Sequence, residues 1–368
     1  MTELARRTGA VNLGQGVPEL PSPPGLLEEV AGAVRAGSNQ YPPAAGFPAL
    51  REAVAGHQRR RYGLEYRPQD EVLVTTGATE ALASALLALC DPGDEVIAFD
   101  PVYDAYPAGA RFAGARLVPV PLAEDGDGFV LDADALRAAV TPRTRVLLLN
   151  TPHNPTGKVF TEAELAVVAG LCVEHGLTVV TDEVYEHLVY DEGVHRPLAA
   201  LPGMRERTLV ISSAGKTFNV TGWKVGWVCG PAPLVAAVAA AKQFLTYASG
   251  TPYQEALARA LGGVEAWAAE LRGTLRRNRD LLSEGLSRAG LRPLRAEAGY
   301  FLQADVRAWG YTDGVRFCRE LPLRAGVVAI PTSAFQLYPD APSHFVRFSF
   351  CKREESVLAA VEKLLKAA

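Results

Sequence analysis

The sequence of 368 residues contains little cysteine, no long apolar run and no block of charges of one sign. Its five cysteines are an odd number, lie far apart and include no Cys-x-x-Cys pair, so they predict neither a disulfide framework nor a zinc site. No stretch approaches the roughly 18 apolar residues that a membrane helix needs, and no apolar core follows the two arginines near the N-terminus. We therefore expect a cytoplasmic protein with reduced thiols and no membrane partner.

The charge balance excludes a second class of partner. Thirty-seven basic and 41 acidic side chains give a net charge of −4, and no basic stripe is present. Nucleic-acid binding needs clustered lysine and arginine, so we expect no nucleic-acid partner. His153 and His187 have no other residue spaced to join them in metal binding or acid–base chemistry, so no metal site is expected.

The middle of the chain alternates short apolar runs with helical patterns such as 162–174. The runs are 72–74, 95–99, 146–149, 178–180, 209–211 and 225–228. This alternation predicts βαβ units and a parallel sheet. Three successive leucines, Leu147 to Leu149, indicate a sheet that is buried on both faces.

Towards the C-terminus the pattern changes. A long helix is expected over about 263–289, followed by alternating strands and an amphipathic helix near 354–366. We therefore predict an α/β fold, a three-layer sandwich with a mainly parallel central sheet, together with a smaller α+β domain. The large domain is expected to span 39–251, and residues 1–38 with 252–368 are expected to form the small domain.

The residues that follow the predicted strands are polar and chemically diverse. The four segments are TTGATE (75–80), NTPHNPTG (150–157), TDEVY (181–185) and SSAGK (212–216). Ligands of an open parallel sheet bind beyond the carboxyl ends of its strands, so these segments are expected to meet at one edge. They would bring together a helix N-terminus, an amide, a carboxylate, a phenol and an amine.

The letters Gly215-Lys216-Thr217 end a nucleotide-binding P-loop, but a P-loop also needs a glycine five positions before its Gly-Lys pair. That position is Val210, which lies in an apolar run that predicts a strand. A P-loop nucleotidase is therefore disfavoured, and Lys216 needs another role.

The groups at the strand ends are those that pyridoxal 5′-phosphate (PLP) requires. PLP needs an amine for covalent attachment, a carboxylate that keeps its ring nitrogen protonated, and a helix N-terminus for its phosphate. Taken singly, Asp182 could cap a helix, Asn154-Pro155 could form a turn and Arg347 could form a surface ion pair. These explanations do not account for Asp182 and Asn154 lying at adjacent strand ends.

Eight motifs run through nearly the whole chain: VNLGQGVPELPSPP, QYPPAAGFPALREAV, TTGATEAL, LLNTPHNPTGKVF, TDEVYEHLVY, SSAGKTFNVTGWKVGW, GYFLQADV and FVRFSF. In this order and spacing the sequence resembles the fold-type I PLP-dependent aminotransferases (class I/II), and most of all the kynurenine/glutamine transaminase group. The motifs TDEVY and SAGKTF…TGWKVGW are highly specific. The resemblance implies a homodimer with active sites at the subunit interface, which exchanges an amino group between an amino acid and a 2-oxo acid.

The resemblance also implies the roles of individual residues around the cofactor ring. Lys216 would bind the cofactor covalently and move a proton between the substrate α-carbon and the cofactor C4′. Asp182 would pair with the ring nitrogen, and Tyr103 would stack on the ring face. Tyr185 and Asn154 would hydrogen-bond the phenolic oxygen. Lys216, Asp182 and Tyr185 would thus be the catalytic residues.

The phosphate and the substrate would be held by further residues. The resemblance places the phosphate on the turn at Gly77, the backbone N–H groups of Ala78 and Thr79, the side chains of Ser213 and Lys224, and Tyr41 from a partner subunit. Arg347 would bind the substrate α-carboxylate, with help from Asn154 and the backbone of Gly16. Two features depart from the family pattern. Many relatives outside the group have arginine at position 224, and only ten residues precede Val11.

The substrate side chain is expected to meet aromatic walls. Arg111 and Arg145 read as surface residues, so no second buried cation for a dicarboxylate is expected, whereas Tyr41, Tyr103, Tyr247 and Phe335 are candidates for the lining. We predict glutamine, methionine, phenylalanine and kynurenine as donors, aromatic or aliphatic 2-oxo acids as acceptors, and poor use of aspartate. A cysteine-conjugate β-lyase (C–S lyase) is an alternative with the same residues. A PLP-binding regulator without catalysis is an alternative of another class.

Overall fold

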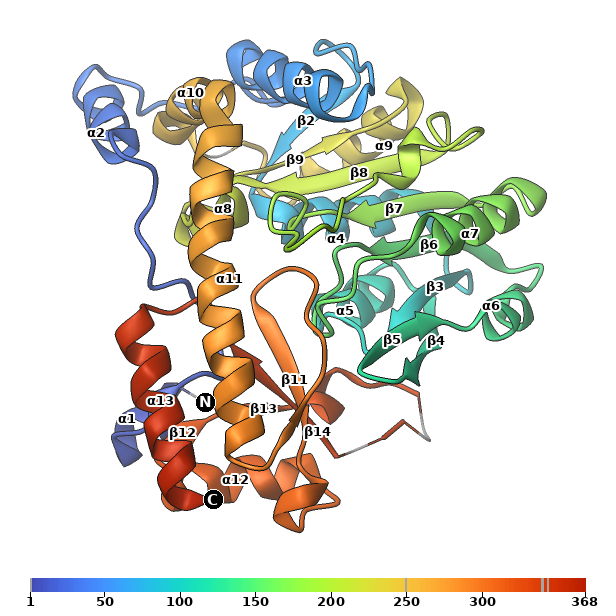
Figure 1. Ribbon diagram of the computed structural model, residues 1–368. Helices are drawn as coiled ribbons and strands as arrows, with labels where there is room; N and C mark the ends of the chain where they lie inside the picture. The colour runs from blue at the N-terminus through green and yellow to red at the C-terminus, as the bar shows by residue number, and fades with distance from the viewer. Residues whose placement is uncertain (1, 249, 339–340, 343) are drawn as a thin grey trace.

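The structure is a computed structural model that describes residues 2–248, 250–338, 341–342 and 344–368. Its largest feature is an eight-stranded sheet with the strand order β2-β9-β8-β7-β6-β3-β4-β5 (Figure 1). The strands are β2 (Val72–Thr75), β3 (Glu95–Asp100), β4 (Arg116–Asp125), β5 (Gly128–Leu131), β6 (Thr144–Asn150), β7 (Thr178–Asp182), β8 (Thr208–Ser213) and β9 (Gly226–Cys229). The strands from β8 through β7, β6 and β3 to β4 are parallel, which confirms a mainly parallel sheet.

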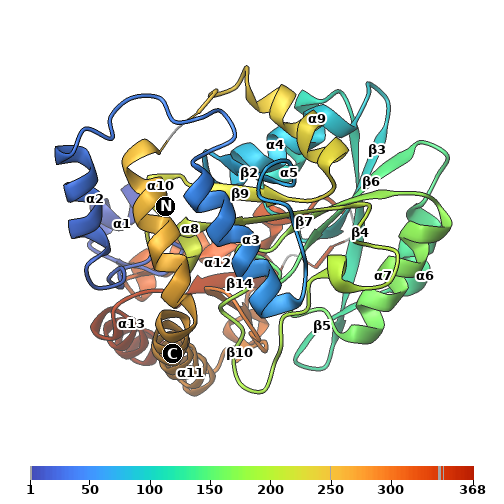
Figure 2. The ribbon, with the colours of Figure 1, turned by 90° about the horizontal axis from the view of Figure 1, so that it is seen from above.

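Helices cover both faces of this sheet (Figure 2). One face carries α4 (Gly77–Leu89), α5 (Ala105–Phe112) and α9 (Ala232–Lys242), and the other carries α3 (Pro48–Tyr62), α6 (Ala133–Ala139) and α7 (Glu162–Glu174). Leu148 packs into the core of the first face, whereas Leu147 and Leu149 pack into the core of the second. The predicted three-layer sandwich, with a sheet buried on both sides, is therefore confirmed.

The predicted helices are present, and local chemistry explains where one of them begins. The expected helix 162–174 is α7, which starts with a capping box in which the side chains of Thr161 and Glu164 each accept the other's backbone N–H. The long helix predicted over 263–289 is α11 (Val264–Arg288), and the last predicted helix is α13 (Glu354–Ala367).

Two features of the large sheet differ from the sequence-based prediction. β9 was expected to be parallel, but it pairs antiparallel with both β8 and β2. The connection from β8 holds only the one-turn helix α8 (Ala214–Thr217) and a 3₁₀ turn, so no long helix returns the chain to the start of the sheet. The hairpin of β4 and β5 was not predicted, because prolines and charged residues interrupt its apolar pattern.

A smaller unit packs below the sheet edge and has its own hydrophobic core. Its antiparallel sheet has the order β10 (Arg292–Pro293), β11 (Phe301–Asp305), β14 (Phe345–Ser349) and β13 (Ile330–Pro331). The helices beside it are α11, α12 (Gly314–Arg324) and α13, and β1 (Val11–Asn12), which follows α1 (Thr2–Thr8), pairs with β12 (Val327–Val328). The smaller α+β part of the predicted fold is thus present, and the N-terminal segment joins it.

The division of the chain at residues 38/39 and 251/252 stays a prediction. The helices near these points are α2 (Leu26–Arg35) and α10 (Thr251–Ala260), which pack on each other. Leu26 of α2 and Leu257 of α10 belong to the same core cluster as Leu50 and Trp227. Both helices therefore pack on the part of the molecule that contains the large sheet.

All five cysteines are buried and free. In the part of the chain that the structure describes, no helix is both long and apolar enough to cross a membrane.

Candidate active site

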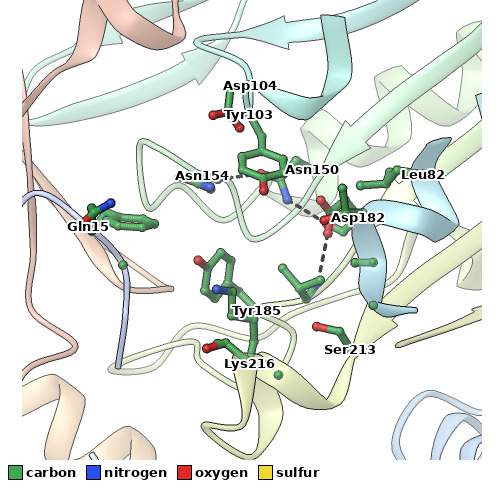
Figure 3. A pocket seen from close by; sticks show the side chains of 18 of the residues that line it. Gln15, Leu82, Tyr103, Asp104, Asn150, Asn154, Asp182, Tyr185, Ser213 and Lys216 are labelled. Atoms are coloured by element: carbon green, nitrogen blue, oxygen red, sulfur yellow. Dashed lines mark hydrogen bonds between the residues drawn. The ribbon is translucent and has the colours of Figure 1, made fainter. Parts of the chain in front are cut away.

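A cavity of about 470 Å³ lies at the carboxyl ends of β6, β7 and β8, beside the N-terminus of α4 (Figure 3). Its volume is typical of a small-molecule site. Of the 13 predicted site residues, those that line it are Gly16, Gly77, Ala78, Thr79, Tyr103, Asn154, Asp182, Tyr185, Ser213, Lys216, Lys224 and Arg347. The thirteenth, Tyr41, does not border the cavity. Parallel strands thus bring the predicted groups to one edge of the sheet.

Lys216 lies in the one-turn helix α8 that follows β8. Its Nζ is 5.4 Å from the ring centroid of Tyr300 and 5.9 Å from that of Tyr185, and it donates no hydrogen bond within the described residues. Burial lowers the pKa of Lys216 below its ordinary value, and the nearby positive charges of Lys224 and Arg347 act in the same direction. A lowered pKa increases the neutral fraction of the amine, which is the form that acts as nucleophile and base.

Asp182 is the last residue of β7, and its side chain is almost completely buried. Its Oδ2 accepts a hydrogen bond of 2.7 Å from the hydroxyl of Tyr106, and Asn150 Nδ2 donates to its carbonyl oxygen at 2.9 Å. Burial raises the pKa of Asp182 to about 6, although the Tyr106 hydrogen bond and the charge of Lys216 act to lower it. A buried carboxylate of this kind is suited to a cationic partner in the cavity.

Tyr103 and Tyr185 lie on opposite sides of the open space, with Lys216 beside Tyr185 (Figure 3). Burial keeps the pKa of the Tyr185 phenol well above its ordinary value, so it remains a hydrogen-bond donor at neutral pH. The backbone N–H of Asn154 donates to Asn150 Oδ1 at 2.6 Å, which fixes the turn that carries the Asn154 amide. The arrangement leaves a slot with an aromatic ring on one side and polar groups around it.

The N-terminus of α4 forms a cradle that fits a phosphate. Gly77 has a φ of 74°, and a Cβ on Gly226 would lie 2.7 Å from the carbonyl carbon of Gly77, so glycine is required for β9 to approach this turn. The N–H groups of Ala78 and Thr79 lie in the first turn of α4, where no intrahelical acceptor exists. Lys224, in the segment that leads into β9, adds a positive charge to the same cavity. No acceptor for these donors is found among the described residues, and together with Lys216 and Asp182 they match the groups of PLP.

Arg347 projects from β14 into the wall of the cavity and is 5% exposed. Its guanidinium carbon lies 3.8 Å from the ring centroid of Phe301 and 4.3 Å from that of Phe335. Nη1 donates to Asn154 Oδ1 at 3.1 Å, but the buried Nε has no partner, and no carboxylate pairs with Arg347 among the described residues. Burial lowers its pKa to about 10, which still leaves it charged at neutral pH. The surface ion pair considered from sequence is therefore wrong, and the buried charge of Arg347 is suited to bind an anionic group of a ligand in the cavity.

Tyr41 and Tyr247 lie outside the cavity. Tyr41 is 80% exposed, and its ring packs edge-to-face on Tyr247 with 5.5 Å between the centroids. Tyr247 was expected in the aromatic lining, but within this chain it does not border the cavity. Tyr103 and Phe335 do line it as predicted, and Arg111 and Arg145 are exposed surface residues as expected.

Sequence reasoning missed several residues at the site. Phe301 stands inside the quoted motif GYFLQADV, and Asn150 is the first residue of its strand-end segment, so both could have been found. Tyr106 follows Tyr103 by three residues, a spacing that places both on one side of a helical turn. Gln15 and Asp104 also line the cavity. Nothing in the sequence pointed to them except that each is next to a predicted site residue, Gly16 or Tyr103.

A histidine partner was also missed. His187 was expected to lie alone, but His57 Nε2 is 3.0 Å from His187 Nε2, and both belong with Glu186 to a buried cluster whose ligand atoms lie within 4.8 Å of one another. The oxygens of Glu186 already accept hydrogen bonds from Tyr62 and Ser212. The two histidines thus bond to each other, and Glu186 lies 3.9 Å from His187 Nδ1. His57 is 130 residues from His187, so sequence spacing could not reveal this partner.

Comparison with known proteins identifies the class to which this fold and site belong. A family model described as aminotransferase class I and II matches residues 8–364. The chain belongs to this family and is a PLP-dependent aminotransferase. The resemblance inferred from the motifs is therefore confirmed.

Individual relatives are similar over almost the whole chain. A probable N-succinyldiaminopimelate aminotransferase of Mycobacterium tuberculosis is 52% identical over 99% of this chain and 94% of the relative. Kynurenine–oxoglutarate transaminase 3 of Mus musculus is 39% identical over 100% of this chain and 86% of the relative. A solved structure of N-succinyldiaminopimelate aminotransferase from Mycobacterium tuberculosis superimposes with a TM-score of 0.98 at 53% identity, covering 100% of this chain and 96% of that one.

Proposed function

We propose that this aminotransferase binds PLP through the residues that line the cavity, and that its amino donor has a side chain that is uncharged near the α-carbon. The observation that carries the proposal is Arg347, a buried guanidinium that lines the cavity without a carboxylate partner. An α-carboxylate is common to all amino acids and 2-oxo acids, and arginine binds it with two parallel hydrogen bonds. One site would then serve both substrates in alternating half-reactions.

Each residue of the cavity has a distinct task in this proposal. Bound PLP supplies an electron sink for negative charge at the substrate α-carbon. The Lys216 amine takes the proton from that carbon, and its lowered pKa supports this role because more of it is neutral at physiological pH. Asp182 would keep the ring nitrogen protonated, and Tyr185 and Asn154 would hydrogen-bond the cofactor's phenolic oxygen.

The walls of the cavity favour side chains without charge near the α-carbon. The cations among the described residues that line it are Lys216, Lys224 and Arg347. The proposal assigns the first two to the cofactor and Arg347 to the α-carboxylate, so the described residues that line the cavity offer no further cation to a second carboxylate of a short donor. A desolvated carboxylate without a partner costs several kcal/mol, whereas Phe301 and Phe335 can contact an aliphatic or aromatic side chain. Methionine, glutamine, phenylalanine and kynurenine fit these walls.

A more specific donor is favoured by one relative. The Mycobacterium tuberculosis protein that is 52% identical is named for N-succinyldiaminopimelate. In that compound an aliphatic stem separates the reacting amino acid group from a distal amide and two further carboxylates. The stem is therefore uncharged where it would pass the aromatic walls, and its charges would lie towards the mouth. N-succinyldiaminopimelate is the second candidate donor.

A donor panel tests the proposal. We expect N-succinyldiaminopimelate or the neutral donors methionine, glutamine, phenylalanine and kynurenine to exceed aspartate in kcat/KM by roughly a hundredfold, because aspartate must desolvate an unpaired carboxylate. The measurement is single-turnover absorbance of purified enzyme with each donor, followed by steady-state assays with 2-oxoglutarate and with neutral 2-oxo acids. A kcat/KM for aspartate well above all other donors would contradict the proposal.

The same panel separates transamination from β-elimination. A C–S lyase would release pyruvate and ammonia from a cysteine conjugate without a 2-oxo acid acceptor. We expect product formation from the preferred donor to depend on the acceptor.

We also propose that the chain acts as a homodimer in which Tyr41 completes the partner's phosphate site. This proposal is supported by the exposure of Tyr41, Phe244 and Leu245, which are 80%, 84% and 48% exposed on neighbouring segments. Exposed apolar side chains that gather in one place are typical of a protein interface. The partner's hydroxyl would reach the cradle at the N-terminus of α4.

The variant Tyr41→Phe tests the dimer proposal. We expect its Kd for PLP to rise by roughly tenfold, because a hydrogen bond to a charged phosphate is lost while the ring remains at the interface. Fluorescence titration of the cofactor-free protein and sedimentation velocity provide the measurements. Tyr311→Phe, which removes a surface hydroxyl bonded to Glu320, is the matched control and should bind PLP normally. A monomer that binds PLP at full affinity would exclude the proposal.

A further inference from the structure

Tyr106 lies directly behind the cofactor cavity and touches Asp182. Its hydroxyl donates to Asp182 Oδ2 at 2.7 Å, and both side chains are buried. Among the residues that the structure describes, the second oxygen, Oδ1, receives only a long contact of 3.4 Å from the N–H of Val184. The phenol is therefore the principal side-chain donor to this carboxylate in the described residues.

The position of Tyr106 follows from the first turn of α5. The backbone N–H of Tyr106 bonds to the carbonyl of Tyr103 at 3.0 Å, and their rings meet edge-to-face with 5.5 Å between the centroids. Tyr103 thus borders the cavity, whereas Tyr106 packs in the apolar core between α4, α5 and the sheet, among residues such as Leu82 and Ala110. This packing holds the ring in place, so the hydroxyl oxygen stays within hydrogen-bonding distance of Asp182 Oδ2.

The hydroxyl of Tyr106 keeps its proton. Burial raises its pKa well above the ordinary value, and the charge of Asp182 acts in the same direction. A phenol that cannot ionise acts as a permanent donor, and a permanent donor favours the ionised form of the carboxylate that it faces. In a low-dielectric core such a bond is electrostatically strong.

We propose that Tyr106 is a positioning residue for transamination, because its O–H group orients the Asp182 carboxylate and stabilises its ionised form opposite the ring nitrogen of PLP. The inference rests on the proposed role of Asp182. Between Asp182 and the ring nitrogen one proton is shared, and it lies either on nitrogen, as an ion pair, or on the carboxylate, as a neutral pair. The Tyr106 bond favours the ion pair, in which the protonated ring withdraws electrons from the substrate.

The first test uses the cofactor-free protein, so that it does not depend on any role of PLP. We expect Tyr106→Phe to raise the pKa of Asp182 by roughly one pH unit, since a hydrogen bond to the ionised form is lost. The pKa is measured by 13C NMR titration of protein labelled in its aspartate carboxyl groups, with Asp182→Asn to identify the resonance. Tyr190→Phe is the matched control, because it removes another buried hydroxyl, bonded to the carbonyl of Gly299, and should leave Asp182 unchanged.

A second substitution guards against a variant that fails to fold. Replacement of Tyr106 by 3,5-difluorotyrosine keeps the shape of the ring and makes the hydroxyl a stronger donor. It should move the pKa of Asp182 in the opposite direction, downwards. An Asp182 pKa that is the same in wild type, Tyr106→Phe and the fluorinated protein would overturn the inference.

The second test reads the proton on the cofactor. With PLP labelled with 15N in the ring, Tyr106→Phe should move the ring-nitrogen resonance towards the value of the unprotonated ring and lower kcat by about tenfold. In an Asp182→Asn background the same substitution should cause no further loss, because Tyr106 acts through Asp182. Losses that multiply, or an unchanged resonance, would contradict the inference. Failure of PLP to bind at Lys216 would instead defeat the proposed function and leave the first test intact.

Discussion

Replacement of Lys216 by alanine is expected to lower kcat for transamination by about ten-thousandfold or more, since both the covalent attachment point and the general base are removed. The amine lies in α8, just after β8, without a hydrogen-bond partner in the described residues, and on one side of the rings of Tyr185 and Tyr300. Its lowered pKa makes this amine more reactive at neutral pH than a lysine with the ordinary pKa. Single-turnover kinetics with the preferred donor measure the loss.

The site of attachment is tested separately from activity. Borohydride reduction of the PLP-loaded wild type, followed by peptide mapping, should place a pyridoxyl group on the peptide that contains Lys216. Lys224 supplies the matched control, because it is the other lysine that lines the cavity. The Lys224→Gln variant should still be labelled at Lys216, although it should bind PLP less tightly. Label on Lys224 or on any other lysine of the wild type would show that the assignment of Lys216 is wrong.

Asp182→Asn is expected to retain PLP but to lose at least about a hundredfold in kcat, because a neutral amide cannot stabilise the protonated ring nitrogen. The amide has nearly the same shape as the carboxylate, and its oxygen can still accept the hydrogen bond from Tyr106. Loss of turnover with retained binding would therefore report charge rather than packing. Near-wild-type turnover by this variant would refute the role given to Asp182.

Although Asp182→Asn should lower kcat, it should make the cofactor-free protein more stable than wild type towards high pH. Burial raises the pKa of Asp182 to about 6 in the folded state, whereas an aspartate in the unfolded chain titrates near 3.9. The folded state thus binds the proton more tightly, so this group's contribution to stability is greatest at low pH and is lost as the pH rises through about 6. Between pH 5 and pH 8 wild type should lose about 1.4 kcal/mol relative to Asp182→Asn. Urea unfolding at the two pH values measures the difference, and equal pH dependence would contradict it.

Much of the site could be predicted because a parallel sheet gathers distant segments by a simple rule. The carboxyl ends of neighbouring strands lie together, and the structure pairs Asn150 directly with Asp182 across β6 and β7. Each segment could therefore be recognised locally, as a strand followed by polar residues. The same rule placed Lys216 after β8 without any knowledge of its contacts.

Contacts between segments that do not follow this rule could not be predicted. Tyr106 and Asp182 are 76 residues apart, and His57 and His187 are 130 residues apart, so neither pair leaves a periodic signal in the sequence. The direction of β9 was missed for a related reason, since apolar runs show that a strand exists but not which way it runs.

The sequence by itself determined the class of fold, the order of the strands' polar ends and the chemistry that they bring together, because residue type and local periodicity encode these features. The tertiary structure decided how those groups are surrounded. It buried Arg347 between Phe301 and Phe335, enclosed Asp182 with Tyr106 behind it, and left Tyr41 exposed away from its own cavity. Burial and neighbouring charges set the pKa values of Lys216 and Asp182, and these depend on the packing of residues that lie far apart in the chain.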